Sequence, residues 1–193
     1  MDMNRKKNKL AIFDLDGTLF DTCSVNFFAY QRALREEGYI LDRNYYKTQC
    51  NGRYFRDFLP LIIDNPTDDL IERIHHRKKQ LYPTFLHHAV INSHLFCLIE
   101  QIHDEYHIAL VTTASKANCI EILDHNNKTS LFELILTQED VFSVKPDPEG
   151  FLKAMAHFGI APKFTLVFED SSVGIEAARR CGTSILAVLN FPV

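Results

Sequence analysis

Five short, continuously apolar runs most constrain what this chain can fold into. They are rich in Ile, Val, Leu and Phe, and they lie at residues 10–14, 108–112, 132–136, 164–169 and 184–189. A run without alternating polar residues is typical of a strand buried on both faces, as in a parallel sheet covered by helices. Segments with helical spacing separate the last four runs. The sequence therefore predicts an α/β fold with a doubly wound, parallel, Rossmann-like core.

The connection after the first run is much longer than one crossover requires. Residues 22–89 carry no strong strand signal, and the next helix is predicted at 94–107. Segments 27–38 and 67–82 have amphipathic helical spacing, and Thr67 is placed to cap the second of them. We therefore predict two domains. The α/β core comprises 1–21 and 90–193, and a small α-helical cap domain is inserted at 22–89.

Composition excludes several classes of protein. The net charge of -4, with a basic cluster only at residues 4–9, argues against a nucleic-acid partner. No apolar run approaches the ~20 residues needed to cross a bilayer, so we expect no membrane partner. The 5 cysteines form no CxxC pair, which favours reduced thiols. We expect a cytoplasmic protein that is a monomer or a weak dimer.

Polar side chains follow four of the predicted strands, in order along the chain. The first strand runs into "DLDGT" (14–18), the second into Thr112 and Thr113, and the fourth into Glu169 and Asp170, while Lys145 follows the third. Polar residues commonly follow strands, so each position has a simple structural explanation. Open α/β sheets, however, bind ligands beyond the carboxyl ends of their strands. The occurrence of all four polar segments, each after a strand, favours a single site at the carboxyl ends of the strands.

Phosphoryl transfer is the chemistry that fits these residue types. A carboxylate nucleophile forms an aspartyl-phosphate, which divides one difficult hydrolysis into two easier steps. Mg²⁺ prefers oxygen ligands and offsets the repulsion between an anionic nucleophile and a phosphate. A hydroxyl and a lysine can hold the remaining phosphoryl oxygens. Because strand side chains alternate, Asp16 is expected to face the same way as Asp14 and to act as acid and base.

The four segments resemble the signatures of the haloacid dehalogenase-like hydrolase superfamily, in the subgroup with a helical cap after the first motif. They are "DLDGT" (14–18), Thr112 in "LVTTASK", Lys145 in "KPDP" and "EDSSVG" (169–174). The resemblance implies that Asp14 is the nucleophile and a Mg²⁺ ligand. It also implies that Asp16 is the general acid and base and gives its backbone carbonyl to the metal.

The resemblance implies roles for the remaining motif residues as well. Asp170 completes the metal site with help from Glu169, and Thr112 and Lys145 bind the phosphoryl group. Binding of substrate is further implied for Gly17, Thr18 and Thr113, of which Gly17 permits the turn beneath the phosphate. Gly174 allows close approach where the last motif enters its helix.

Several activities within and outside this superfamily remain open. The favoured one is a Mg²⁺-dependent phosphatase acting on a small phosphomonoester of the sugar or polyol phosphate type. A phosphomutase of the β-phosphoglucomutase type is the alternative, although Asn26 stands where such enzymes have a histidine. A phosphonatase would need a cap lysine, for which Lys47 is the nearest candidate. A dehalogenase lacks the second Asp of the first motif, so Asp16 argues against that activity.

The alternative from another class is a non-catalytic, receiver-like phospho-switch. It uses the same residue types, but its phosphorylated Asp ends the third strand, where this chain has "LILTQ". Within the cap, substrate contacts are predicted in 50–58, through Arg53 and Arg56. Exposed arginines on a helical insert are usually solvated, and that simpler interpretation stands beside the functional one.

Overall fold

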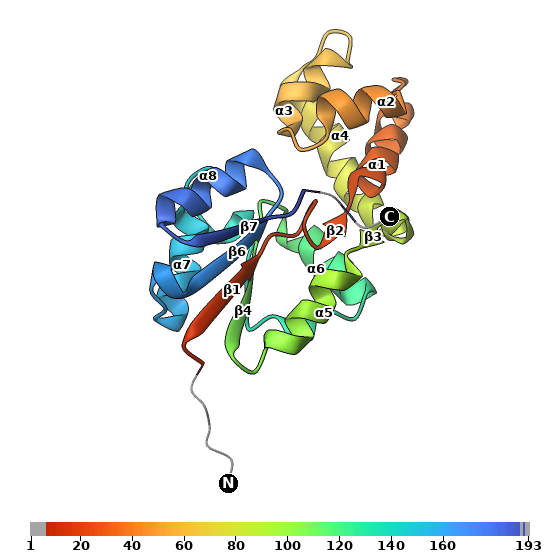
Figure 1. Cartoon of the computed structure of the whole chain (residues 1–193). Helices are drawn as coiled ribbons and strands as arrows, with labels where there is room; N and C mark the ends of the chain where they lie inside the picture. The colour runs from red at the N-terminus through yellow and green to blue at the C-terminus, as the bar shows by residue number, and fades with distance from the viewer. Residues whose placement is uncertain (1–6, 190, 192–193) are drawn as a thin grey trace. The chain divides into compact units, whose positions relative to one another are not determined.

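The computed structural model describes residues 7–189 and 191 (Figure 1). Contacts within it divide the chain into two compact units. One comprises the chain up to Asp21 and from Ile91 onward, and the other comprises Thr22–Val90. We call them the core unit and the helical unit.

A five-stranded sheet forms the centre of the core unit. Its strands are β1 (Lys9–Phe13), β4 (Tyr106–Val111), β5 (Leu134–Leu136), β6 (Thr165–Glu169) and β7 (Ser184–Ala187). Their order is β5-β4-β1-β6-β7, and all four neighbouring pairs are parallel. After β1, the chain therefore adds β4 and β5 on one side of that strand and then β6 and β7 on the other. The predicted doubly wound α/β fold is confirmed, with its switch point at β1.

Four helices cover this sheet. They are α5 (Ser93–Ile102), α6 (Lys116–His125), α7 (Glu149–Phe158) and α8 (Ser172–Cys181), and short 3-10 segments lie at η4 (Thr129–Leu131), η5 (Gln138–Asp140) and η6 (Pro162–Phe164). Figure 1 shows α7 and α8 on one side of the sheet and α5 and α6 on the other. Leu10 and Ile12 of β1 pack in one buried cluster with residues of α7 and α8. Phe13 points to the opposite face, where its ring stacks on Phe168 at 4.3 Å.

The end of the first core helix differs from the sequence prediction. Helical spacing predicted a helix over 94–107, whereas α5 ends at Ile102 and β4 begins at Tyr106. Pairing with the central strand explains the difference, because Tyr106 is in register with Lys9 and His107 with Leu10. Ladder hydrogen bonds to β1 outweigh the weak local preference of this segment for a helix.

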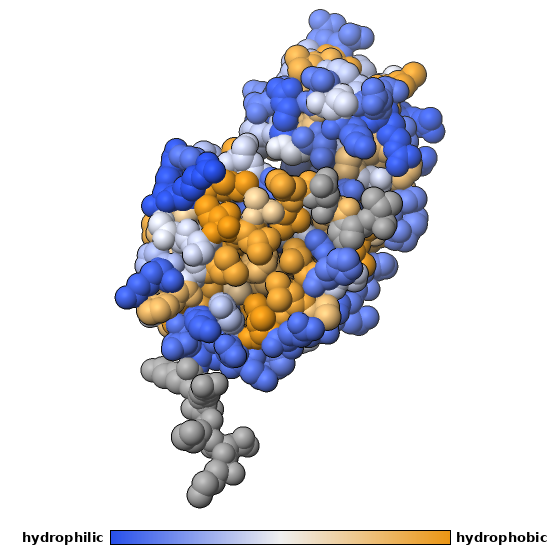
Figure 2. Space-filling view, viewed as in Figure 1, coloured by the Kyte–Doolittle hydropathy of each residue, from blue (hydrophilic) through white to orange (hydrophobic). Residues whose placement is uncertain are grey.

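One edge of the sheet carries an apolar surface. Figure 2 shows orange surface over the region of β6 and β7, and Leu186 and Leu189 are 44% and 83% exposed. β7 is the last strand of the sheet on that side. In the part of the chain that the structure describes, these two leucines therefore remain open to solvent.

The helical unit has its own hydrophobic core. Its elements are α1 (Cys23–Glu36), α2 (Arg43–Tyr45), the π-helical η1 (Tyr46–Cys50), α3 (Phe55–Phe58), η2 (Leu59–Leu61), α4 (Asp68–Leu81) and η3 (Tyr82–His88). The predicted cap of α4 is confirmed, since Thr67 Oγ1 accepts a hydrogen bond from the Leu70 N–H at 3.3 Å. Lys78 is only 5% exposed, and its ammonium lies over the rings of Tyr30 and Tyr82.

Two short strands, β2 (Phe20–Asp21) and β3 (Val90–Ile91), pair where the chain leaves the core unit and returns to it. The sequence prediction contained neither strand, because two residues are too few to give a periodic pattern. Beside them, the Asn92 side chain donates to the carbonyl of Thr18 at 3.1 Å. Among the described residues, no helix has the length and apolar character of a membrane span.

Candidate active site

The predicted site residues of the core unit gather at the carboxyl ends of β1, β4 and β6. Asp14 follows β1, Thr112 follows β4, and Glu169 ends β6. Lys145 comes from the loop between β5 and α7. Parallel pairing places these strand ends at the same edge of the sheet, beside the switch point. The structure therefore brings together the four motif segments that the sequence singled out.

Lys145 holds two carboxylates in place. Its Nζ lies 2.6 Å from Asp14 Oδ1, 2.7 Å from Glu169 Oε1 and 2.9 Å from the carbonyl oxygen of Val111. Three donors thus meet three acceptors, which is the full capacity of an ammonium group. The side chain of Lys145 is 6% exposed, so these charge-assisted bonds are shielded from water.

Three carboxylates face one another at this edge. Oxygen atoms of Asp14, Glu169 and Asp170 all lie within 4.8 Å of one another, and this is the one group of potential metal ligands found among the described residues. When all three are ionised, three negative charges stand against the single positive charge of Lys145. Hard oxygen donors with an excess of negative charge are what Mg²⁺ requires, so the residues present fit this ion.

The crowding of charge is visible in the acid–base properties of the site. Burial raises the pKa of Asp14 to about 8; Lys145 opposes this shift, whereas Glu169 and Asp16 add to it. Burial and the neighbouring Glu169 raise the pKa of Asp170 to about 6. Burial lowers the pKa of Lys145, but Asp14 and Glu169 outweigh it and the net shift is upward. A cation at these oxygens would favour the ionised carboxylates.

The sequence places Ser171 in the motif "EDSSVG", but we predicted no separate role for it. Its backbone N–H and its hydroxyl both donate to Glu169 Oε2, at 2.8 and 2.9 Å. The same hydroxyl oxygen accepts from the N–H of Gly174 at 3.0 Å and caps α8. Ser171 therefore fixes the orientation of a carboxylate and the start of a helix at once. A serine immediately before a helical run was the available signal.

Two glycines leave room for the carboxylates. Gly17 has a φ of +88°, and a Cβ placed on it would overlap the Asp170 carboxylate. A Cβ on Gly174 would overlap the carboxylate of Glu169. The first glycine meets both a conformational and a steric requirement, and the second meets a steric one. Both let the backbone approach the acidic cluster closely.

Asp16 lies in a turn, which corrects the reason given for its orientation. β1 ends at Phe13, and Asp16 forms an isolated bridge with Phe20, so the alternation of strand side chains does not apply to it. Its carboxylate is outside the group of three, although its charge contributes to the raised pKa of Asp14. Thr18, in the same turn, donates through Oγ1 to Asp170 Oδ1 at 3.1 Å.

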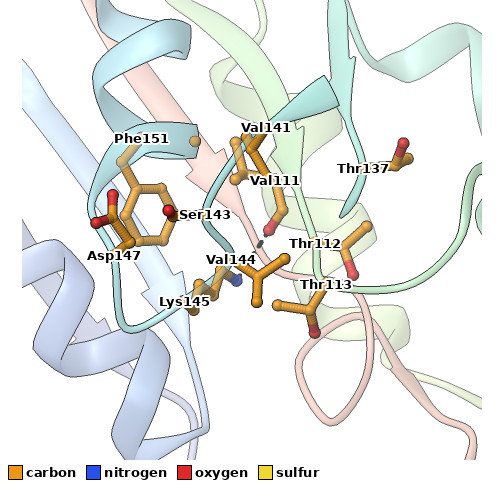
Figure 3. Close-up of a pocket in the computed structure, with 11 residues that line it drawn as sticks. Val111, Thr112, Thr113, Thr137, Val141, Ser143, Val144, Lys145, Asp147 and Phe151 are labelled. Atoms are coloured by element: carbon orange, nitrogen blue, oxygen red, sulfur yellow. Dashed lines mark hydrogen bonds between the residues drawn. The ribbon is translucent and has the colours of Figure 1, made fainter. Parts of the chain in front are cut away.

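A pocket lies beside Lys145 (Figure 3). Residues from β4, from the loop before α7 and from α7 itself line it: Val111, Thr112, Thr113, Thr137, Val141, Ser143, Val144, Lys145, Asp147, Gly150 and Phe151. Thr112 is buried, and its hydroxyl oxygen accepts from the N–H of Ala114 at 3.0 Å. Thr113 is exposed. The two predicted phosphoryl-binding residues Thr112 and Lys145 thus line one pocket.

Arg53 and Arg56 lie in the helical unit. Arg56 is ion-paired with Asp68 at 3.3 Å and also with Glu72. Arg53 donates to the carbonyl of Gln49 at 3.1 Å. Both guanidinium groups therefore have partners within their own unit, and their contacts with substrate stay predictions.

The sequence profile of the haloacid dehalogenase-like hydrolases matches residues 11–188. The protein belongs to this family. Among curated proteins, it is 28% identical over 178 residues to the phosphorylated carbohydrates phosphatase of Thermotoga maritima, covering 89% of this chain and 80% of that one. It is 26% identical to the fructose-1-phosphate phosphatase YqaB of Escherichia coli, covering 92% and 94%.

A solved structure shows the same fold. CbbY from Rhodobacter sphaeroides in complex with phosphate superposes with a TM-score of 0.83 at 22% identity, covering 95% of this chain and 87% of that one. The likeness to this structure shows the fold, and the family match over residues 11–188 confirms the predicted family and its hydrolase class. Named phosphatases among the relatives also support the predicted subclass, the phosphoric monoester hydrolases.

Proposed function

We propose that this haloacid dehalogenase-like protein is a Mg²⁺-dependent phosphatase that hydrolyses a small phosphomonoester through an aspartyl-phosphate on Asp14. The observation that carries the proposal is the contact of Asp14 with Lys145, inside a group of carboxylates suited to a divalent cation. Membership of a hydrolase family makes a receiver-like switch the weaker interpretation. The helical unit is proposed to be the cap domain predicted at 22–89.

Two substitutions at phosphorus make up the proposed reaction. A carboxylate oxygen of Asp14 attacks phosphorus, and the bond to the leaving oxygen breaks while Asp16 donates a proton to that oxygen. Asp16, now ionised, takes a proton from water, and the water oxygen attacks the phosphorus of the aspartyl-phosphate. The bond to Asp14 breaks and inorganic phosphate leaves. Lys145 and Thr112 hold phosphoryl oxygens throughout, as preorganised partners for the developing charge.

Asp14, Glu169 and Asp170 are the side chains that would hold Mg²⁺, with the backbone carbonyl of Asp16 as a further proposed ligand. The ion supplies positive charge that lets an anionic nucleophile approach an anionic phosphate. Thr18 and Ser171 orient Asp170 and Glu169 through the hydrogen bonds described above. Because all three donors of Lys145 are engaged, its ammonium is proposed to exchange one of these acceptors for a phosphoryl oxygen when substrate binds.

A sugar or polyol phosphate is the proposed substrate class, supported by the two phosphatases of phosphorylated carbohydrates named above.

Arg53 stays a proposed substrate contact, because its single hydrogen bond to a carbonyl leaves other donors available. We expect Arg53→Ala to raise KM for the natural substrate about tenfold while leaving KM for p-nitrophenyl phosphate unchanged. Arg56→Ala serves as its comparison, since Arg56 is engaged by two carboxylates. Equal KM values in wild type and Arg53→Ala would assign Arg53 to the surface.

Release of inorganic phosphate is the expected outcome, as opposed to transfer within a sugar. Asn26 stands where a mutase has its histidine, and its side-chain amide donates to Thr22 Oγ1 at 3.2 Å. A neutral amide engaged in this way offers no proton to a departing sugar hydroxyl. ³¹P NMR of the protein with Mg²⁺ and a panel of hexose phosphates, including a hexose 1-phosphate, measures the products. Formation of a hexose 6-phosphate without free phosphate would establish a mutase.

The two glycines beside the carboxylates give a test of site geometry. Gly17→Ala and Gly174→Ala are each expected to lower kcat about 10²-fold, because displacing Asp170 or Glu169 by about 1 Å disturbs the reacting geometry. Gly182→Ala is the matched control, since Gly182 also has a positive φ but nothing within 4 Å of the added Cβ. It should lower the Tm and leave kcat within about twofold of wild type. Wild-type kcat in both site variants would contradict the tight packing of this site.

A further inference from the structure

A second set of cationic and aromatic side chains lies in the helical unit, between α1 and η3. A pocket of about 110 Å³ is lined there by Phe28, Gln31, Arg32, Arg35 and Phe85. The first four of these residues belong to α1. They are spaced at intervals of three and four positions, so they share one side of that helix. We call it the α1–η3 pocket. None of its residues takes part in the proposed hydrolysis.

Aromatic rings form one wall of the α1–η3 pocket. The rings of Phe28 and Phe85 stack with their centroids 5.8 Å apart and their planes at 26°. His88 packs on Phe28 at 4.3 Å. All three side chains are half-buried, so part of the ring surface remains accessible. The pocket volume is somewhat below the cavity of about 150 Å³ that binds benzene in a protein interior. The space suits one aromatic ring at most.

Positive charge surrounds this wall. Arg32 is 3.2 Å from Glu36, but that carboxylate also accepts a bond of 2.7 Å from Arg77. One negative charge is thus shared between two guanidinium groups. The guanidinium of Arg35 is exposed and has no hydrogen bond or ion pair with any other part of the chain that the structure describes. The guanidinium of Arg43 lies 5.6 Å from the centroid of Phe28. The pocket therefore carries excess positive charge.

We propose that the α1–η3 pocket binds a small aromatic anion, namely an aromatic ring that bears a phosphate, sulfonate or carboxylate group. The ring packs on Phe28 and Phe85, and the anionic group takes the free donors of Arg35 together with Arg32. Guanidinium groups match the geometry of such anions through paired N–H donors. The combination of an apolar wall and a few convergent charged groups is typical of small-molecule sites.

Arg35 also lies in the last turn of α1, where a cation interacts favourably with the helix dipole. That role accounts for one positive charge and predicts an effect on the Tm alone. It does not account for a half-exposed aromatic pair beside the same residue. Binding measurements separate the two roles, because only a ligand site makes affinity depend on Arg35.

The test is a titration of the full chain, without Mg²⁺, with benzenesulfonate and phenylphosphonate, followed by NMR. Neither probe carries a hydrolysable ester bond, so the result does not depend on the proposed phosphatase activity. We expect saturable shifts at Phe28, Phe85 and the Nε–H of Arg35. Arg35→Ala should weaken binding at least tenfold. Phe85→Ala should weaken it by a similar factor for an aromatic probe.

Three comparisons make the result specific. Arg179→Ala removes an exposed charge from the last turn of α8 and should leave the affinity unchanged. Arg35→Lys keeps the charge but not the paired donors, and should bind more weakly than wild type with an unchanged Tm. Methanesulfonate, which has no ring, should bind at least tenfold more weakly than benzenesulfonate. Shifts confined to the surroundings of Lys145, or equal losses in Arg35→Ala and Arg179→Ala, would overturn the proposal.

Discussion

Asp14→Asn is expected to lower kcat more than about 10³-fold with p-nitrophenyl phosphate as substrate. The amide nitrogen and oxygen of Asn are far poorer nucleophiles than a carboxylate, and the Asn side chain is a poorer metal ligand. Steady-state assays with saturating Mg²⁺ measure the effect. Retention of a tenth of the wild-type kcat would remove Asp14 from the role of nucleophile.

Loss of activity in this variant should not come from unfolding. Lys145 keeps Glu169 and the Val111 carbonyl as partners, so no unpaired charge is left buried. The pKa of Asp14 is raised, and its ionised form is therefore destabilising in the ion-free fold. Without Mg²⁺ at pH 8, the Tm of Asp14→Asn should equal or exceed that of wild type. Asp104→Asn, in the exposed segment before β4, controls for loss of a carboxylate and should leave kcat unchanged.

Removal of Mg²⁺ is expected to abolish turnover, and the affinity for Mg²⁺ should fall as the pH falls. Protons compete with the ion for Asp14 and Asp170, whose pKa values are raised to about 8 and about 6. Between pH 8 and pH 6 the apparent Kd for Mg²⁺ should rise about tenfold or more. Activity titrations with Mg²⁺ at both pH values, after treatment with EDTA, measure it. Full turnover in EDTA would contradict the metal assignment.

The same pKa shifts set the sign of a stability effect. A carboxyl group with a raised pKa contributes its stabilisation fully below its ordinary pKa, near 3.8, and loses it as the pH rises through about 8. The ion-free protein should therefore lose Tm between pH 5 and pH 8. Mg²⁺ should restore Tm, and by more at pH 8 than at pH 6, because it binds the ionised form. A Tm gain that is larger at pH 6 would show that other groups bind the ion.

Much of the core unit was predictable because its signals are local and repeated. Continuously apolar runs located every strand of the main sheet, and the polar residues after those runs located the site. Short elements were not predictable in this way. β2 and β3 are two residues long. The first residues of β4 were predicted as helix from their local spacing, whereas pairing with β1 outweighs that preference and makes them a strand.

Within the site, the types of residue were predictable but some of their contacts were not. The sequence placed Lys145 near the phosphate, yet its bonds to Asp14 and Glu169 depend on tertiary structure. Gly17 was expected to permit a turn, whereas its steric role against Asp170 depends on tertiary structure. The role of Ser171 within the last motif was not predicted, because a serine beside two acidic residues is compatible with a capping residue and with a solvated loop.

The central position of β1 has a consequence for the order in which the chain folds. β1 pairs with β4 and β6, so the middle strand of the sheet leaves the ribosome before either neighbour exists. The helical unit, by contrast, is one continuous segment, Thr22–Val90, with its own apolar core. Its contacts are closer in sequence than the contact between Lys145 and Asp14, which spans 131 residues. The insertion can therefore fold during synthesis while Asp14 is still at the end of an unpaired strand, and the core sheet forms last.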